Sequence, residues 1–350
     1  MRGHLGSCPV VLSSATPTVE SWLNAERGRY RHLVLPARFS GAEPPRLGAI
    51  DMREDPPERG RWLSPKLGQM VRETFEAGEQ TLLFLNRRGY APLTLCRTCG
   101  YRLACPNCSS WLVEHRFRGV LACHHCGHEI RRPETCPACD NKDTLVACGP
   151  GVERVAEEVR ERFPEARIVL LSSDVTPNVA ALRQVLESIE QGHCDLVIGT
   201  QLVAKGHHFP GVTLAAILNV DQGLFGTDFR SSERMAQLIV QVAGRAGRDD
   251  RAGEVVIQTH HPDHPLLLQL IPQGYADWVR AALAERHAAC LPPASHIALV
   301  RAEASRQPLP LEFLEGVRTR VEQLERDELE IWGPVPATME RRAGRFRAQL

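Results

Sequence analysis

Eight cysteines between Cys96 and Cys139 constrain this chain more than any other sequence feature. They form four C-x-x-C pairs, and each such pair can present two thiolates to one metal ion. A closed tetrahedral zinc site uses two pairs, so four pairs predict two zinc sites. Fourteen residues separate the second pair from the third, which is close to the separation of about 15–20 residues in zinc ribbons.

The spacing also predicts which pairs combine. Residues 111–116 and 120–123 predict two short strands with a turn at Arg118-Gly119, and this hairpin would bring the second and third pairs together. The inner site is then made of Cys105, Cys108, Cys123 and Cys126, and the outer site of Cys96, Cys99, Cys136 and Cys139. Only five residues separate the first pair from the second, too few for an easy sequential pairing. A disulfide framework is the alternative, although nothing in the sequence indicates secretion.

The composition is that of a globular protein without bulk charge. The chain has 350 residues, 43% of them hydrophobic, and a formal net charge of zero, so it is long enough for two or three domains. Because the net charge is zero, a surface that binds nucleic acid must be a local basic patch. It has no signal peptide and no apolar run that could span a membrane. We therefore expect a cytoplasmic protein without a membrane partner, whose thiols stay reduced.

Outside the cysteine module, strands and helices alternate. Apolar strand candidates lie at 47–52, 81–85, 168–171, 195–198, 212–220 and 255–259. Helices are predicted at 65–77, 152–163, 177–191 and 231–244. Such alternation predicts an α/β fold with a parallel sheet covered on both faces. The cysteine module, residues 96–140, is then an insertion within one α/β domain at 46–260.

The two ends of the chain are predicted to lie outside this α/β domain. Residues 1–45 are predicted to contain a short apolar strand at 9–12 and one helix, which cannot bury their apolar faces alone. Residues 261–295 are predicted to be a helical linker. Residues 296–350 are predicted to be a small α+β domain that stops before it is complete.

Two stretches have the residues and the setting for ligand chemistry. Residues 199–206, G-T-Q-L-V-A-K-G, directly follow a predicted strand, and residues 241–248, Q-V-A-G-R-A-G-R, end a predicted helix. The carboxyl ends of parallel strands are where α/β sheets bind ligands. Arg245 and Arg248 are flanked by glycines, so both could reach one phosphate group, which guanidinium groups bind bidentately. The alternative for this stretch is a solvated loop.

These stretches resemble known helicase motifs. Ser14-Ala15-Thr16, residues 199–206 and residues 241–248 are similar to motifs III, V and VI of superfamily 2 helicases. Other residues narrow the resemblance from the superfamily to one family. They are 84–92 (F-L-N-R-R-G-Y-A-P), the eight cysteines, 204–210 (A-K-G-H-H-F-P) and 333–337 (G-P-V-P-A). Together they resemble the PriA family of bacterial replication-restart helicases over essentially the whole chain.

The resemblance implies a fold and an activity. The fold would be a second RecA-like helicase lobe with a two-zinc insertion, preceded by a remnant of the first lobe and followed by a truncated α+β C-terminal domain. The activity would be part of an ATP-dependent 3′-to-5′ DNA helicase that binds replication forks and starts primosome assembly. ATP and Mg²⁺ would be cofactors of the intact protein, in addition to two zinc ions. Its partners would be forked DNA, primosome proteins and single-stranded DNA-binding protein.

The resemblance also implies roles for single residues. Thr200 and Gly206 would touch the DNA backbone and couple it to the nucleotide pocket, and Lys205 would also bind DNA. Gln241 would sense the nucleotide, while Arg245 and Arg248 would reach the γ-phosphate. Gln241, Arg245 and Arg248 are thus the candidate catalytic residues of this chain.

A third candidate interface lies at the C-terminal end. Residues 341–347 carry four arginines around Phe346, a composition suited to phosphate contact with base stacking. Arg342, Arg345 and Arg347 are therefore candidate DNA ligands. The alternative is a solvated strand end, because arginine is abundant throughout the chain.

Two motor motifs are missing from the sequence. It has no G-x-x-x-x-G-K-[ST] loop to cradle phosphates and no D-E-x-H-type segment to hold Mg²⁺. We therefore expect this chain alone not to hydrolyse ATP. The rival hypothesis is a non-enzymatic zinc-binding adaptor that docks DNA or proteins without nucleotide.

Overall fold

The structure is a computed structural model. It describes residues 6–35, 43–86, 93–96, 98–115, 119–123, 125–148, 152–171, 179–200, 209–218, 220–225, 228–247, 253–324, 326 and 328–350. The chain forms two compact units: Met1–Gly89 with Val152–His296, and Tyr90–Gly151 with Ile297–Leu350. In the described part of the chain, no helix is long and apolar enough to cross a membrane.

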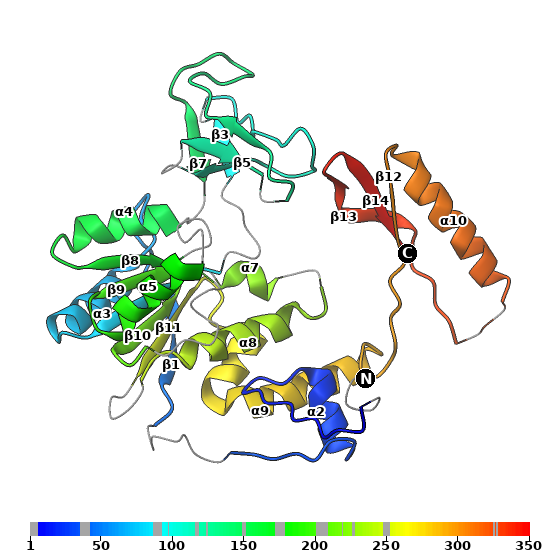
Figure 1. The fold of residues 1–350 in the computed structure, drawn as a ribbon, viewed down its shortest axis with the longest axis horizontal. Coiled ribbons are helices and arrows are strands. Elements are labelled where there is room, and N and C mark those ends of the chain that lie inside the picture. The colour runs from blue at the N-terminus through cyan, green and yellow to red at the C-terminus, as the bar shows by residue number, and fades with distance from the viewer. Residues whose placement is uncertain are drawn as a thin grey trace. The chain divides into compact units, whose positions relative to one another are not determined.

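The first unit is built on a six-stranded sheet in the order β1-β11-β10-β2-β9-β8 (Figure 1). Its strands are β1 (Arg46–Asp51), β2 (Gln80–Phe84), β8 (Ile168–Leu171), β9 (Leu196–Gly199), β10 (Val212–Ile217) and β11 (Glu254–Thr259). Every neighbouring pair is parallel. Each residue of β2, β9 and β10 is buried, as expected for strands covered on both faces. The predicted parallel α/β fold is confirmed.

Helices cover both faces of this sheet. On one face, α3 (Pro65–Glu76) and α4 (Val152–Arg162) pack Leu67 and Val155 against Leu83 of β2. On the other face, α5 (Val179–Glu190) and α8 (Ser231–Ala243) pack against Leu82 and Phe84. The short helix α7 (Asp221–Leu224) precedes α8. The alternation of Leu82, Leu83 and Phe84 between the two cores follows from the two-residue period of a strand.

Two further helices belong to the second of these cores. They are α2 (Val19–Glu26), capped by Thr18, and α9 (Pro265–Ala288). From α9, Leu267, Tyr275 and Trp278 are buried in the core that contains α8. The apolar strand expected at residues 9–12 is not formed, and Val10, Val11 and Leu12 are 65%, 88% and 70% exposed. A strand needs a hydrogen-bonded neighbour, and none of the described strands pairs with this segment.

The described residues of the second unit form three small antiparallel sheets. In the cysteine module, β3 (Leu93–Cys96) pairs with β7 (Leu145–Cys148), while β4 (Val113–His115), β5 (Val120–Ala122) and β6 (Glu129–Arg131) form a meander. The predicted hairpin between the second and third cysteine pairs is thus confirmed as β4–β5. In the C-terminal part, β12 (Arg301–Ala304), β14 (Arg345–Gln349) and β13 (Val335–Arg342) form one sheet beside α10 (Pro308–Glu322).

Candidate functional site

The outer cysteines come from the end of β3 and from the segment that precedes β7. The Sγ atoms of Cys96 and Cys139 lie 3.7 Å apart, as do those of Cys99 and Cys136. The four sulfur atoms all lie within 4.8 Å of one another. The structure therefore groups the first and fourth pairs, as the sequence predicts.

The inner cysteines converge at the β4–β5 hairpin. Cys105, Cys108, Cys123 and Cys126 again place their Sγ atoms within 4.8 Å of one another, with Cys105 and Cys126 separated by 3.7 Å. After Cys123 the chain folds back sharply, because the Gly127 amide donates to the Cys123 carbonyl at 2.9 Å. Gly127 has a φ of 74°, a conformation that glycine adopts without steric cost. This turn aims Cys126 back toward Cys123.

These distances decide between zinc and disulfides. A disulfide needs a sulfur–sulfur distance of about 2.05 Å. Four thiolates at about 2.3 Å from one zinc ion form a tetrahedron whose edges are about 3.8 Å. The observed separations of 3.7 Å match the tetrahedron. Each cluster therefore has the ligand type, the number of ligands and the size that a structural zinc ion requires.

Hydrogen-bond partners favour the thiolate form at one cysteine of each cluster, Cys96 and Cys123. Cys96 Sγ lies 3.1 Å from the Thr144 hydroxyl, and this hydrogen bond is the main cause that lowers the pKa of Cys96 to about 5. Burial disfavours the Cys123 thiolate, but the Ser110 hydroxyl and two backbone amides outweigh it and lower the pKa of Cys123 to about 6. Because zinc binds the thiolate form, the Thr144 and Ser110 contacts favour metal binding at these two cysteines. Burial instead raises the pKa of Cys105 to about 12.

The stretch that resembles motif V begins at the carboxyl edge of the sheet. Thr200 directly follows β9, and its amide donates to the Leu171 carbonyl at 3.2 Å. Thr200 as a whole is only 6% exposed. The predicted DNA and nucleotide ligands Lys205 and Gly206 lie outside the described residues.

The stretch that resembles motif VI lies at the opposite edge. Gln241 is exposed in the last turn of α8, and Arg245 is half-buried in the turn that follows. The Gly247 amide donates to the carbonyl of Val212, the first residue of β10, at 3.0 Å. Since the strands are parallel, this places the turn at the amino edge of the sheet, away from Thr200. Arg248 lies outside the described residues.

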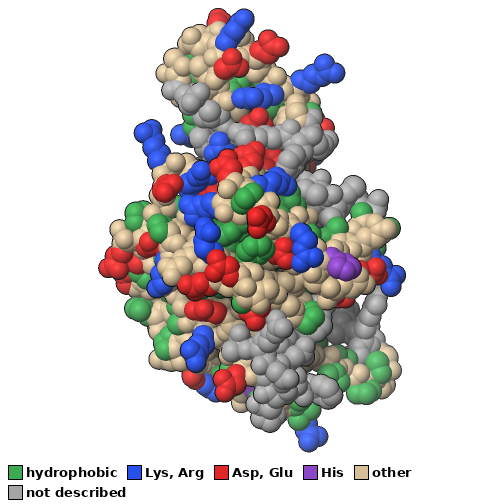
Figure 2. All heavy atoms as spheres, turned by 90° about the vertical axis from the view of Figure 1, so that its left-hand side faces the viewer, with side chains coloured by type: hydrophobic (Ala, Val, Ile, Leu, Met, Phe, Trp, Pro, Cys, Tyr) green, Lys and Arg blue, Asp and Glu red, His purple; other side chains and the backbone are tan. Residues whose placement is uncertain are grey.

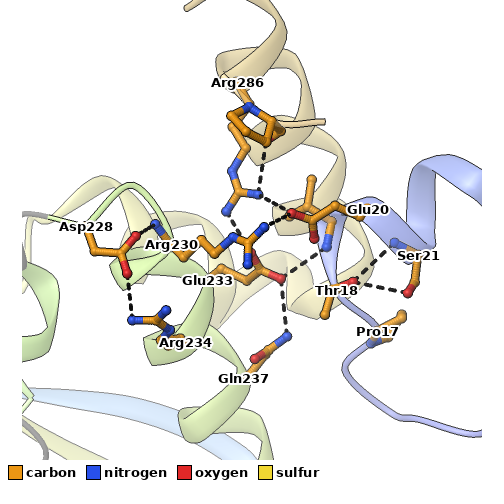
Figure 3. Close-up of polar contacts among 12 residues, drawn as sticks. Pro17, Thr18, Glu20, Ser21, Asp228, Arg230, Glu233, Arg234, Gln237 and Arg286 are labelled. Atoms are coloured by element: carbon orange, nitrogen blue, oxygen red, sulfur yellow. Dashed lines mark hydrogen bonds and ion pairs between the residues drawn. The ribbon is translucent and has the colours of Figure 1, made fainter. Parts of the chain in front are cut away.

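A buried ion pair lies where α2, α8 and α9 meet (Figure 3). Glu233 in the first turn of α8 contacts Arg286 of α9 at 2.7 Å, and their side chains are only 4% and 6% exposed. Glu233 also accepts hydrogen bonds from the Val19 amide at 3.1 Å and from Gln237 at 3.4 Å. One carboxylate therefore holds the first residue of α2 and a charge on α9 at the same time.

Three more contacts attach the segment after Ser14-Ala15-Thr16 to this junction. The Tyr275 hydroxyl donates to the Pro17 carbonyl at 2.7 Å, and Gln237 Nε2 donates to the Thr16 carbonyl at 3.3 Å. Arg230 donates to Glu20 at 2.8 Å. The sequence offers no local signal for this network, because Glu233 and Val19 are 214 residues apart. The segment that resembles motif III is thus fixed to the helix that leads to Gln241.

The candidate DNA ligands at the C-terminus have different surroundings. Arg345 and Arg347 both contact Glu303, at 2.5 Å and 3.7 Å. Arg342 is exposed. Arg345 and Arg347 therefore share one carboxylate partner, whereas Arg342 has no ion pair among the described residues.

Figure 2 shows one face of the molecule. Among the described residues on that face, basic and acidic side chains are intermingled, in keeping with the formal net charge of zero.

Comparison with known proteins gives two matching family models. The model described as the PriA DNA helicase Cys-rich region (CRR) domain matches residues 105–131, which contain the inner cluster. The model described as the Primosomal protein N C-terminal domain matches residues 287–350.

Whole proteins match over most of the chain. Replication restart protein PriA of Haemophilus influenzae is 42% identical over 341 residues, which cover 97% of this chain and 46% of that protein. Its namesake in Bacillus subtilis is 40% identical over 300 residues, 85% of this chain and 37% of that protein. The chain spans about half the length of the curated relatives it matches. Among solved structures, S. cerevisiae Dbp5 bound to RNA and ADP BeF3 is 12% identical, with a TM-score of 0.39 over 77% of this chain and 50% of that one. Similarity at this level supports no conclusion about function.

Proposed function

Because this chain belongs to the PriA family of replication restart proteins, we propose that it supplies the second motor lobe, a two-zinc module and part of the C-terminal domain of a DNA helicase. The observation that carries this proposal is the 42% identity along 97% of the chain. A parallel α/β sheet and two groups of four cysteines in one chain support it. The helicase would act at replication forks, with primosome proteins and single-stranded DNA-binding protein as partners of the intact protein.

Each cysteine cluster binds one structural zinc ion in this proposal. Zinc would hold the short strands of the module together, since strands of three or four residues bury little apolar surface alone. Structural zinc contributes on the order of 10 kcal/mol or more to folding in small domains. The module would therefore depend on metal, whereas the first unit has a large apolar core of its own.

The nucleotide would be contacted by residues at the end of α8. In the proposed motor, Gln241 senses the bound nucleotide, and Arg245 and Arg248 neutralise the charge that develops on the γ-phosphate. Gly206 would lie near the same nucleotide. ATP and Mg²⁺ would be held mainly by a first motor lobe, because this sequence has no phosphate-cradling loop.

DNA would be contacted by Thr200 and Lys205 and, in the C-terminal part, by Arg342, Arg345 and Arg347. Thr200 is buried in the structure, so a contact with the DNA backbone would require a change of its surroundings. Arg342 is already exposed. We therefore propose Arg342 as the first C-terminal residue to test.

The proposal is tested by supplying a first motor lobe in trans. This chain is combined with the first motor lobe of a PriA relative, and fork-stimulated ATP hydrolysis is measured. Arg245→Ala should reduce turnover by about 10³-fold, the lower range for arginines that act on a γ-phosphate. Arg183→Ala, on the exposed face of α5, is the matched control and should leave turnover unchanged. Fork binding that is insensitive to nucleotide, without turnover in any combination, would instead identify a zinc-binding adaptor.

A further inference from the structure

The turn of the C-terminal hairpin lies against the second cysteine pair, within the second unit. Ala343 and Gly344 connect β13 to β14. The Ala343 amide donates a hydrogen bond to Cys108 Sγ at 3.2 Å. The Gly344 amide donates to the Asn107 carbonyl at 2.7 Å. An inner-cluster cysteine thus receives a hydrogen bond from a residue that lies 235 positions further along the chain.

Two more hydrogen bonds extend this contact. The Ser109 amide donates to the Arg341 carbonyl at 2.8 Å, and the Arg341 amide donates to the Ser109 hydroxyl at 3.0 Å. The segment Asn107–Ser109 and the hairpin therefore exchange donors in both directions. Such reciprocal pairing fixes the position and the orientation of the hairpin together.

The contact depends on the shape of the metal-binding turn. Asn107 and Ser109 flank Cys108, and they occupy their positions because Cys105 and Cys108 converge on one point. In small metal-binding domains this convergence disappears without the metal. Partners that hydrogen-bond to metal ligands also orient those ligands, and removing such a partner typically lowers metal affinity by about 10–100-fold.

The outer cluster has different partners. Its sulfur atoms contact Thr144, Ala138 and Asn141, all of which lie between β3 and β7 in the sequence. The outer cluster therefore has the same ligand set as the inner one, but its described hydrogen-bond partners lie in the same segment as the cluster itself. This difference makes the two clusters matched controls for each other.

We propose that zinc in the inner cluster holds the C-terminal hairpin through the hydrogen bonds that the segment Asn107–Ser109 makes with it. This zinc, and not the zinc of the outer cluster, then positions Arg342 on the hairpin. Because coupling between two binding events is reciprocal, the docked hairpin also slows the release of zinc from the inner cluster. This inference rests on the zinc binding proposed above. It adds that the two zinc ions have different roles.

The first test uses the full chain with one cluster disabled at a time. Cys126→Ser removes an inner ligand, and Cys139→Ser removes an outer one. Zinc content is measured for each variant, and hydrogen exchange is followed at the amides of Arg341, Ala343 and Gly344. We expect exchange about 10-fold faster or more in Cys126→Ser and unchanged exchange in Cys139→Ser. Equal acceleration in both variants, or unchanged exchange in Cys126→Ser, would overturn the inference.

A second test starts from the hairpin and leaves every inner ligand in place. In the Cys139→Ser chain, which keeps the inner cluster, zinc transfer to a chromophoric chelator is timed with and without Gly344→Val. Gly344 has a φ of 79° and open space around it, so valine strains the turn without a clash. We expect zinc release about 10-fold faster. Gly78→Val, at a φ of 70° with open space in the first unit, should not change release.

The outcomes of this test separate two failures. Unchanged zinc release in Gly344→Val would overturn the inference while leaving the zinc proposal intact. An unaltered chain that carries no zinc would overturn both.

Discussion

Glu233 and Arg286 form an ion pair at 2.7 Å that joins α8 to α9 in the core of the first unit. The same carboxylate accepts the amide of Val19, so it also fixes the start of α2. Gln241 lies in the last turn of the same helix α8, and Arg245 lies in the turn that follows it. Figure 3 shows Glu233 and Arg286 beside Thr18, where α2, α8 and α9 meet. The network therefore fixes the first turn of α8 to the start of α2 and to α9.

Glu233→Gln should destabilise the first unit by about 3 kcal/mol, the lower range for removing one partner of a buried pair. Arg286 would keep its hydrogen bond to the Pro292 carbonyl at 3.3 Å, which is why we expect the lower range. Unfolding in urea measures the change. Glu187→Gln, in an ion pair with both side chains more than half exposed, should cost about 0.5 kcal/mol or less. Equal destabilisation by the two substitutions would show that the buried ion pair contributes no more to the free energy of unfolding than an exposed one.

Gly253→Ala should disturb the turn that carries Arg245. A Cβ atom at Gly253 would overlap the Gly247 amide nitrogen and lie 2.5 Å from the Ala246 carbonyl carbon, so the backbone must move. We expect a destabilisation of about 1–3 kcal/mol, as for overpacking, measured by thermal or urea unfolding.

Gly316→Ala provides a control of opposite sign. Gly316 lies inside α10 with open space around it, and alanine in a helix interior is favoured over glycine by about 1 kcal/mol. A destabilised Gly316→Ala, or a stable Gly253→Ala, would contradict the packing described for these positions.

Cys136→Ser should reduce the zinc content from two ions per chain to one. Cys194→Ser is the control, because Cys194 is also buried but lies in the first unit, close to Gln80. It should retain both ions. The zinc content is measured by metal analysis of purified protein that has not been exposed to a chelator. A reduced zinc content in Cys194→Ser, or two ions in Cys136→Ser, would contradict the ligand assignment.

Arg167→Met should lower stability at neutral pH and matter less in acid. The side-chain hydrogen bond from Arg167 is the main cause that holds the pKa of Asp195 below its ordinary value. A depressed pKa stabilises the fold above the unfolded value, about 3.9, and this contribution disappears as the pH falls through the folded pKa.

The difference between the two chains should therefore be constant from about pH 7 to 5 and shrink below about pH 4. Urea unfolding at matched pH values measures this difference. Because Arg167 is 58% exposed, solvent screening keeps this difference small. A difference that grows toward acid pH would contradict the assignment.

Arg342→Ala should weaken fork binding and flatten its salt dependence, with a change in slope of about one for each phosphate that the variant no longer neutralises. Arg347→Ala tests a second candidate DNA ligand on the same sheet, which is less exposed and lies near Glu303. It should change the salt slope less. The triple variant Arg342→Ala, Arg345→Ala, Arg347→Ala gives the full contribution of the segment. Identical salt slopes for all variants would favour a solvated strand end.

The sequence by itself determined the grouping of the eight cysteines and the parallel α/β fold. Both depend on local information. The spacing of C-x-x-C pairs limits which pairs can meet, and runs such as Thr81–Leu85 that are apolar on both faces are typical of buried strands. The hairpin β4–β5 was predictable for the same reason, because its two strands are neighbours in the chain.

Only the tertiary structure decided which distant residues meet. It placed the turn after Gln241 at the amino edge of the sheet and Thr200 at the carboxyl edge. From the sequence, both stretches were candidate ligand sites of the same sheet, with nothing to indicate opposite edges. It also paired Glu233 with Arg286 and Ala343 with Cys108, across 53 and 235 residues. Local propensity carries no information about such partners, because they are selected by the packing of whole helices and hairpins against one another.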